Sequence, residues 1–235
     1  MSHTVAFFPG LLCDADLFTE QTKALQAAGY ATVVADFSAV HHESFDAMVI
    51  DALADLPDRF SLVALSMGGY AAMKVLELAP QRVERLALLD TNVRADTPEA
   101  SARRRGLLEL ADKGNFKGVT PRLLPLYLHE SRLDDTALTE RVMRMAEGLG
   151  PEVFRRQQTA ILNREDQRAR LSGFDKPVLA LCGREDQVTP LFLSEEIAEL
   201  APQGELVVIE NCGHLSTMER PAEVNEALRG WLHRP

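Results

Sequence analysis

The stretch that decides the fold is FSLVALSMGGY, residues 60–70. An apolar run ends at Ser66, small residues flank the serine, and a helix-like pattern begins directly after it. This pattern is typical of a nucleophile elbow, in which a strand turns sharply into a helix and a strained serine exposes its oxygen. Ala64, Gly68 and Gly69 leave room where neighbouring backbone must come close, and Ala64 stands where the usual motif has glycine. An ordinary strand-to-helix turn could have a similar sequence, so the interpretation depends on finding catalytic partner residues elsewhere in the chain.

Two later strand-like runs each lead into a loop that carries a residue this chemistry needs. Residues 178–181 precede the loop with Asp186, and residues 206–209 precede the loop with His214. A serine hydroxyl is a poor nucleophile until a base takes its proton, and histidine titrates near neutrality. A carboxylate on the other ring nitrogen fixes the tautomer and stabilises the imidazolium. The sequence therefore predicts Ser66, Asp186 and His214 as catalytic residues.

With its candidate residues in the order serine, aspartate, histidine, the chain resembles the α/β-hydrolase superfamily, specifically its small-molecule esterase-like members. The resemblance extends from about residue 4 to residue 232 and rests on four motifs: FPGLLC at 8–13, LSMGG at 65–69, GRED at 183–186 and CGH at 212–214. It implies a hydrolase that needs no cofactor.

The same resemblance assigns the groups that would bind an oxyanion. An acyl-transfer enzyme stabilises its tetrahedral intermediate with backbone N–H groups. One would come from Met67, directly after the serine, and the other from Leu11 in the loop after the first strand. Most relatives carry His-Gly in that loop, whereas this chain has Pro9-Gly10. Because the donor is a backbone group, Pro9 need not remove it, although proline removes whatever hydrogen bond the usual histidine makes.

The acid has one rival. Asp90 also follows an apolar run, and some members of the family place the acid after that strand. The sequence favours Asp186, because the pattern Gly-x-x-Asp followed by Val-Thr-Pro at 188–190 is the commoner arrangement.

Apolar runs with strand character recur along the whole chain. They lie at residues 5–8, 31–35, 62–65, 86–89, 178–181 and 206–209. Their hydrophobicity is continuous rather than alternating, which is typical of parallel strands buried on both faces. Helical patterns separate them. The fold class predicted is therefore α/β, a doubly wound, mostly parallel sheet, with functional residues beyond the carboxyl ends of the strands.

One segment interrupts this alternation. Residues 94–171 contain no convincing strand, and their helical patterns lie at 98–113, 120–128, 133–147, 151–163 and 164–171. We interpret the segment as an inserted helical cap that excludes water and shapes a pocket, with residues 1–93 and 172–235 forming the core. An ordinary helical connection on the side of the sheet is the alternative. Candidate pocket walls, which are equally consistent with core packing, are Phe18, Tyr70, Tyr127 and Phe154.

Composition and charge limit the kinds of binding partner that the sequence predicts. The chain has 235 residues and a formal net charge of −10, which argues against a nucleic-acid partner. It has no apolar run long enough to span a membrane, and it enters a strand pattern without a signal-like stretch, so cytoplasm is the default expectation. No phosphate-binding loop, dinucleotide fingerprint or histidine pair at metal-ligand spacing is present, so we expect no cofactor, no metal and a small-molecule substrate. Free thiols are expected at Cys13, Cys182 and Cys212.

The leading functional hypothesis is a serine hydrolase that cleaves small carboxylic esters or thioesters through an acyl-enzyme. One alternative keeps the catalytic residues but acts as a carbon–carbon bond hydrolase or lyase on a carboxylated substrate, with an arginine among residues 103–105 on the carboxylate. A second alternative is a binding or receptor module with slow turnover. Fold alone decides none of these.

Overall fold

The computed structural model describes residues 3–234, so residues 1, 2 and 235 of the predicted core lie outside it. The described chain forms one six-stranded sheet in the order β2-β1-β3-β4-β5-β6, and every pair of neighbouring strands is parallel. The strands are β1 (Thr4–Phe8), β2 (Ala31–Val34), β3 (Phe60–Leu65), β4 (Val83–Leu89), β5 (Val178–Gly183) and β6 (Gly204–Ile209). All six predicted runs form strands, and the predicted fold class is confirmed.

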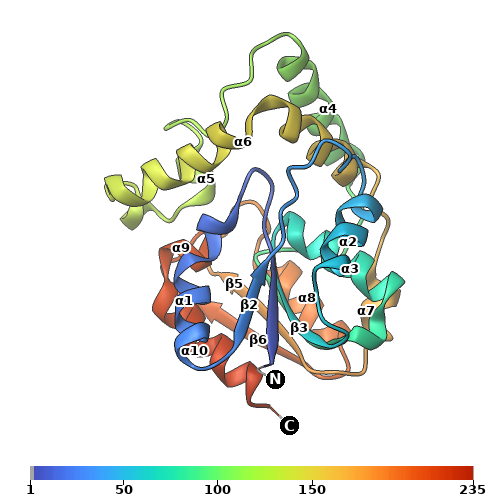
Figure 1. Cartoon of the computed structure of the whole chain (residues 1–235). Helices are drawn as coiled ribbons and strands as arrows, with labels where there is room; N and C mark the ends of the chain where they lie inside the picture. Colours follow the sequence, from blue (N-terminus) through green and yellow to red (C-terminus); the bar gives the residue numbers. More distant parts are fainter. Residues whose placement is uncertain (1–2, 235) are drawn as a thin grey trace.

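Helices cover both faces of the sheet (Figure 1). α1 (Thr19–Ala27) and α10 (Pro221–Leu232) pack together on one face, while α2 (Phe45–Ala54), α3 (Met67–Leu78) and α8 (Phe192–Leu200) lie on the other. Short helical turns complete the core: η1 (Ala15–Phe18), η2 (Pro80–Arg82) and α9 (Ser216–Glu219). None of the helices within residues 3–234 combines the length and the apolar character that a bilayer crossing requires.

Successive strand residues serve two separate cores. In β1, Ala6 and Phe8 join the cluster beneath α2, α3 and α8, whereas Val5 and Phe7 join the cluster beneath α1 and α10. All four side chains are at most 1% exposed. Burial on both faces explains why the strands read as continuous apolar runs in the sequence.

Close backbone contacts fix the start of α3. A Cβ atom on Gly68 would lie 2.1 Å from the carbonyl oxygen of Phe8 in β1, and one on Gly69 would lie 2.4 Å from Oγ1 of Thr91. Real Cβ atoms do not approach other heavy atoms this closely. The glycines after Ser66 therefore let α3 begin against the carboxyl ends of β1 and β4, as the sequence pattern predicted.

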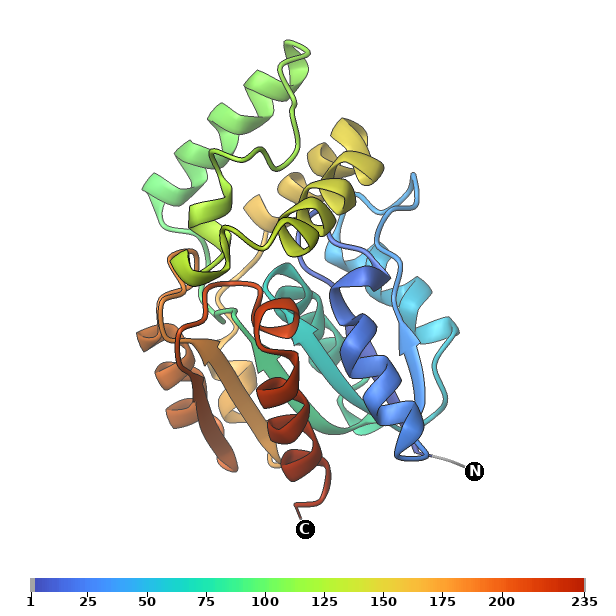
Figure 2. The same ribbon diagram turned by 90° about the vertical axis from the view of Figure 1, so that its left-hand side faces the viewer.

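A helical layer lies above the carboxyl ends of the strands (Figures 1 and 2). It consists of α4 (Pro98–Asp112), α5 (Leu124–Tyr127), η3 (Glu130–Arg132) and α6 (Thr136–Leu162). α6 is two helices joined at Gly150, whose φ of 75° is not helical, followed by Pro151. This break separates the two helices predicted at 133–147 and 151–163. α5 is shorter than the predicted 120–128, because Pro121 and Pro125 restrict helical hydrogen bonding there.

The last helix of the segment predicted as a cap has contacts on the side of the sheet. α7 (Arg168–Ser172) packs against α3 and α8, and Leu171 is fully buried in the core cluster beneath them. The division of residues 94–171 into a separate cap stays a prediction.

We expect Gly68→Ala to destabilise the protein by about 2 kcal/mol or more, because overpacking against fixed atoms costs roughly 1–3 kcal/mol and occasionally more. Chemical denaturation measures this loss. The matched control is Gly230→Ala in α10, where an added Cβ meets no atom within 4 Å. That change should leave stability unchanged or raise it by up to about 1 kcal/mol. Equal stability of the two variants would contradict the close approach of α3 to β1.

Candidate active site

The predicted site residues gather at one edge of the sheet. From β1 the chain first adds β2 on one side and then β3 to β6 on the other side. Such a switch point opens a crevice beyond the carboxyl ends of the strands. The loop after β1 therefore lies beside the loop after β3, which carries Ser66. Asp90, Asp186 and His214 follow β4, β5 and β6 in turn.

Ser66 occupies a strained backbone conformation. Its φ of 54° and ψ of −117° lie outside the regions that side-chain-bearing residues normally adopt. The N–H of Ser66 donates to Leu89 of the neighbouring strand at 3.0 Å, and its carbonyl accepts the Thr91 hydroxyl at 2.7 Å. These two hydrogen bonds hold the serine between β3 and α3. Strain of this kind costs about 1–3 kcal/mol and persists where the surroundings enforce it.

The three predicted residues form one chain of hydrogen bonds. Nε2 of His214 lies 2.9 Å from Oγ of Ser66, and Nδ1 lies 2.9 Å from Oδ2 of Asp186. His214 and Asp186 are buried, while Ser66 is partly exposed. The arrangement suits proton transfer from the serine to the imidazole, because the carboxylate stabilises the charge that the ring acquires.

Thr189 and its neighbours secure the Asp186 carboxylate. The Thr189 hydroxyl donates to Oδ2 at 2.6 Å, and the N–H groups of Val188 and Thr189 donate to Oδ1 at 2.8 and 2.9 Å. Burial opposes ionisation, but the nearby His214 and these donors outweigh it and hold the pKa of Asp186 below its ordinary value. Burial likewise opposes the charged imidazolium, but the Asp186 carboxylate raises the pKa of His214 above its ordinary value.

Asp90, the other candidate acid, is not part of the hydrogen-bonded series Ser66–His214–Asp186. Its carboxylate accepts the Gly183 N–H at 2.9 Å and the Ser216 hydroxyl at 2.5 Å, and it makes no recorded hydrogen bond to His214 within residues 3–234. It is completely buried. Burial and then the negative charge of Asp186 raise the pKa of Asp90 to about 8. The geometry therefore assigns the position beside His214 to Asp186.

The predicted oxyanion donors, the backbone N–H groups of Leu11 and Met67, belong to the two chain segments next to Ser66. Met67 is the first residue of α3, where helical N–H groups have no partner within the helix and favour negative charge. Gly10 is close to the serine, since a Cβ there would lie 3.4 Å from the Cβ of Ser66. Within residues 3–234 neither the Leu11 nor the Met67 N–H has a hydrogen-bond acceptor. Both donors are thus available to a bound oxyanion.

The described chain contains two clusters with metal-binding residue types. One brings together His41, His42 and Asp51, and the other Asp90, Cys182 and Asp186. In the first, Nε2 of both imidazoles contacts the same oxygen of Asp51, at 2.5 and 3.1 Å. Hydrogen bonds therefore account for that cluster. The donors described above occupy the carboxylates of the second, and burial raises the pKa of the Cys182 thiol.

Comparison with known proteins agrees with this arrangement. The model of the alpha/beta hydrolase fold family matches residues 4–221. The chain belongs to this family. It is 30% identical over 190 residues to the pimeloyl-[acyl-carrier protein] methyl ester esterase of Nitrosomonas europaea, a match that covers 77% of this chain and 74% of the relative. The chain is thus a hydrolase, with carboxylic ester hydrolases among its relatives.

Two solved structures share the fold of this chain. A thermophilic esterase from Thermogutta terrifontis, solved with malate bound, superposes with a TM-score of 0.87 at 26% identity, covering 99% of this hydrolase and 90% of the esterase. The enol-lactonase from Burkholderia xenovorans superposes with a TM-score of 0.88 over 100% of this chain and 92% of the lactonase, at 18% identity. The second likeness concerns the fold alone.

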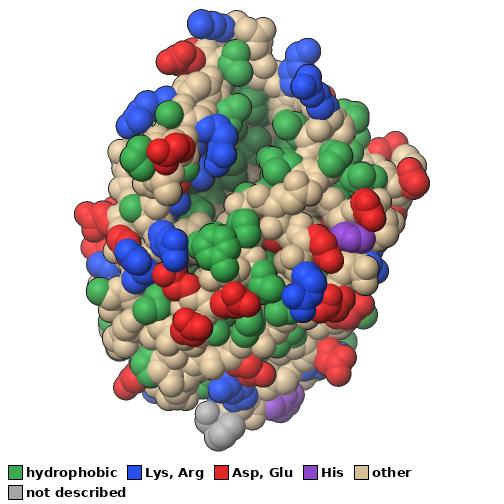
Figure 3. Space-filling model, turned by 180° about the vertical axis from the view of Figure 1, so that it is seen from behind, with side chains coloured by type: hydrophobic (Ala, Val, Ile, Leu, Met, Phe, Trp, Pro, Cys, Tyr) green, Lys and Arg blue, Asp and Glu red, His purple; other side chains and the backbone are tan. Residues whose placement is uncertain are grey.

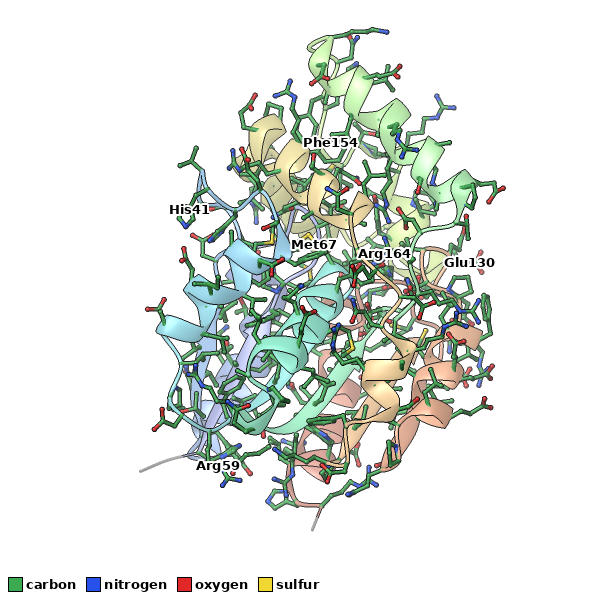
Figure 4. All side chains as sticks on the ribbon, turned by 90° about the vertical axis from the view of Figure 1, so that its right-hand side faces the viewer. His41, Arg59, Met67, Glu130, Phe154 and Arg164 are labelled. Atoms are coloured by element: carbon green, nitrogen blue, oxygen red, sulfur yellow. The ribbon has the colours of Figure 1, made fainter. Side chains whose placement is uncertain are left out.

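The predicted pocket walls have different surroundings in this hydrolase. Phe18 is fully buried against Phe7 in the core beneath α1 and is not a pocket wall. Tyr70 lines a cavity of about 180 Å³ between the helical layer and the core, with the Arg164 guanidinium 4.2 Å from its ring centre. Phe154, on α6, lies above Met67 (Figure 4). Tyr127 has its ring 6.3 Å from that of His214.

The arginine run lies in the middle of α4 but does not act as a unit. Arg104 pairs with Asp96 at 2.7 Å and donates to Gln158 at 2.9 Å, whereas Arg103 and Arg105 are exposed. Arg164 pairs with the same Asp96 carboxylate at 2.5 Å. Two guanidinium groups thus share one carboxylate, and the bonds to Asp96 and Gln158 hold the Arg104 side chain in place.

Several residues that hold the site gave no signal in the sequence. The carbonyl of Tyr127 accepts the His214 N–H at 2.8 Å. The buried Glu219 carboxylate accepts the N–H of Gly213 at 2.9 Å and the N–H of His129 at 2.7 Å. These bonds join the end of α5 and the residues after it to the loop that presents His214. His129 and Glu219 are 90 positions apart along the chain, and Tyr127 is similarly distant from His214, so no local pattern could reveal these two contacts.

We expect the hydrolase to lose stability as pH rises through the titration of Asp90. The folded state binds this proton more tightly than the unfolded state, because the pKa rises from 3.8 to about 8 on folding. The contribution of this proton is therefore complete at pH values below about 4 and is lost toward pH 8. Asp90→Asn keeps the shape without the charge, so the stability of the variant relative to wild type should increase by several kcal/mol, roughly 5, across this window, since each pH unit contributes about 1.4 kcal/mol.

Chemical denaturation at several pH values tests this expectation. Asp36→Asn, at an exposed aspartate that follows β2, is the matched control for removing one carboxylate at a strand end. A stability difference between wild type and Asp90→Asn that stays constant from pH 4 to pH 8 would show that Asp90 is not protonated on folding.

Proposed function

We propose that this hydrolase cleaves small carboxylic esters or thioesters through an acyl-enzyme formed on Ser66. The observation that carries the proposal is the pair of 2.9 Å contacts that His214 makes with Ser66 and Asp186. The positive φ of Ser66, 54°, at the start of α3 supports it. The ester-hydrolysing relatives favour the same substrate class.

The geometry suits a two-step reaction. His214 takes the proton of Ser66 as the hydroxyl oxygen attacks the carbonyl carbon, and the Asp186 carboxylate stabilises the resulting imidazolium. The N–H groups of Leu11 and Met67 hold the oxyanion of the tetrahedral intermediate. Collapse of the intermediate expels the alcohol or thiol, which receives the proton from His214. Water, deprotonated by His214, then attacks the acyl-enzyme, and the carboxylic acid leaves with Ser66 restored.

The surface favours an apolar substrate. Figure 3 shows a hollow with hydrophobic side chains on its walls on the face opposite to that in Figure 1. The neighbouring helices α4 and α5 carry large side chains that are exposed, among them Leu107 and Leu110 on α4 and Leu126 on α5. We propose that these helices form a cap that supplies the acyl or alcohol pocket.

The alternative on a carboxylated substrate gains less support. It requires a guanidinium among residues 103–105 that reaches the substrate carboxylate, yet Arg104 bonds Asp96 and Gln158, and Arg103 and Arg105 are exposed on the surface of α4. A reaction at a carbon–carbon bond is therefore the second candidate. A panel of nitrophenyl esters, coenzyme A thioesters and carboxylated diketones compares the classes directly.

We expect Ser66→Ala to fold normally and to reduce ester turnover by about 10⁶-fold, the order of magnitude seen when a triad nucleophile is lost. Fluorophosphonate should label the wild type rapidly and fail to label the variant. Ser172→Ala, at an exposed serine on α7, is the control and should behave as wild type. Ester turnover retained by Ser66→Ala would remove Ser66 from the mechanism, and rapid labelling without turnover would favour a receptor role.

We expect Asp186→Asn to lower kcat by roughly 10⁴-fold, because His214 loses the charge that orients and stabilises it. Asp90→Asn should cost far less, since Asp90 makes its hydrogen bonds to Gly183 and Ser216. Steady-state kinetics on one nitrophenyl ester compares the two variants. The reverse ranking would assign the acid to the loop after β4.

A further inference from the structure

The turn that carries Leu11 contains a residue in an unfavourable conformation. Leu12 has a φ of 55°, in the left-handed region that branched side chains rarely adopt. The Cys13 N–H closes the turn by donating to the Gly10 carbonyl at 3.1 Å. Something outside the turn must hold Leu12 in place, because this conformation is disfavoured for an isolated chain.

Gln157 on α6 supplies that external contact. Its Oε1 accepts the Leu12 N–H at 2.9 Å, and its Nε2 donates to the carbonyl of Phe37, in the loop after β2, at 3.3 Å. The side chain is only 1% exposed. The partners determine the orientation of the amide, since a backbone N–H requires an acceptor and a backbone carbonyl requires a donor. The side chain of Leu12 packs in a small apolar cluster with Phe154 of the same helix.

These contacts determine where the Leu11 N–H points. A trans peptide group is planar, so its N–H and its carbonyl point in opposite directions. The Gly10 carbonyl is held by Cys13, which directs the N–H of the same peptide group, that of Leu11, away from the interior of the turn. The next peptide group is held through the Leu12 N–H by Gln157. Both peptide groups that flank Leu11 are therefore fixed, one from within the turn and one from the helical layer.

We propose that Gln157 is a positioning residue that holds the turn of residues 10–13 so that the Leu11 N–H faces the oxyanion. The inference rests on the proposed function, because it assigns Gln157 a role in the same acyl transfer. Gln157 touches no reacting atom. Its effect is on the transition state, in which the oxyanion forms, rather than on substrate binding.

The test compares Gln157→Met with Gln158→Met. Methionine fills a similar volume without either hydrogen bond. Gln158 is the adjacent residue on α6, is also buried, at 2% exposure, and bonds Arg104 rather than the turn. Gln157→Met should lower kcat for a nitrophenyl ester by about 10–100-fold with KM changed by less than about threefold, since one oxyanion donor is worth about 10²–10³ in kcat. Gln158→Met should keep kcat within about threefold.

A second measurement follows the turn without catalysis. Hydrogen exchange of the Leu12 amide should be at least tenfold faster in Gln157→Met than in wild type and unchanged in Gln158→Met. Gln157→Glu, which retains an acceptor for the Leu12 N–H, should restore part of kcat. Faster exchange with wild-type kcat, or equal losses of kcat in the two methionine variants, would overturn the inference.

A separate assay tests the proposed function. Wild type and Ser66→Ala are assayed first, and equal rates in those two proteins would reject the acyl-enzyme and the role of Gln157 with it. With turnover dependent on Ser66 established, an unchanged kcat in Gln157→Met rejects the positioning role alone.

Discussion

The structure depends on the close approach of α3 to β1 directly after Ser66. A Cβ on Gly68 would collide with the carbonyl of Phe8 at 2.1 Å, so only glycine allows the helix to begin at this point. The approach forces Ser66 to a φ of 54°, and the hydrogen bonds from Ser66 to Leu89 and from Thr91 to Ser66 hold it there. It also places the first N–H of the helix beside the loop that follows β1. Backbone packing thus accounts for the conformation of the partly exposed serine and for the position of the helix N–H that we propose as an oxyanion donor.

The surroundings of two buried aspartates that follow adjacent strands shift their pKa values in opposite directions. Asp186 receives donors from Thr189 and faces His214, so its charged form is stabilised. Asp90 is completely buried, and this burial, together with the neighbouring negative charge of Asp186, raises its pKa to about 8. The two aspartates therefore differ in protonation. The ionised Asp186 bonds the ring of His214, and the protonated form of Asp90 is favoured where it bonds Gly183 and Ser216.

The helical layer contributes to the site as well as covering it. The carbonyl of Tyr127 at the end of α5 accepts the His214 N–H, and the Glu219 carboxylate accepts the N–H groups of both His129 and Gly213. The second half of α6 binds the loop after β1 through Gln157 and Leu12. The loops that carry His214 and Leu11, the proposed base and a proposed oxyanion donor, are therefore both hydrogen-bonded to this layer. Movement of these helices would therefore alter the geometry around Ser66, in addition to the access of water and substrate.

The sequence by itself determined the six strands, the doubly wound architecture, the family and the candidates Ser66, Asp186 and His214. These follow from local patterns, because buried parallel strands require continuous apolar runs and the elbow requires small residues next to the serine. The tertiary structure alone decided which aspartate faces His214, that α7 packs with the core, and that Gln157 bonds Leu12. Those outcomes depend on contacts between residues far apart in the chain, and a glutamine within a helix carries no sign of the backbone it will meet.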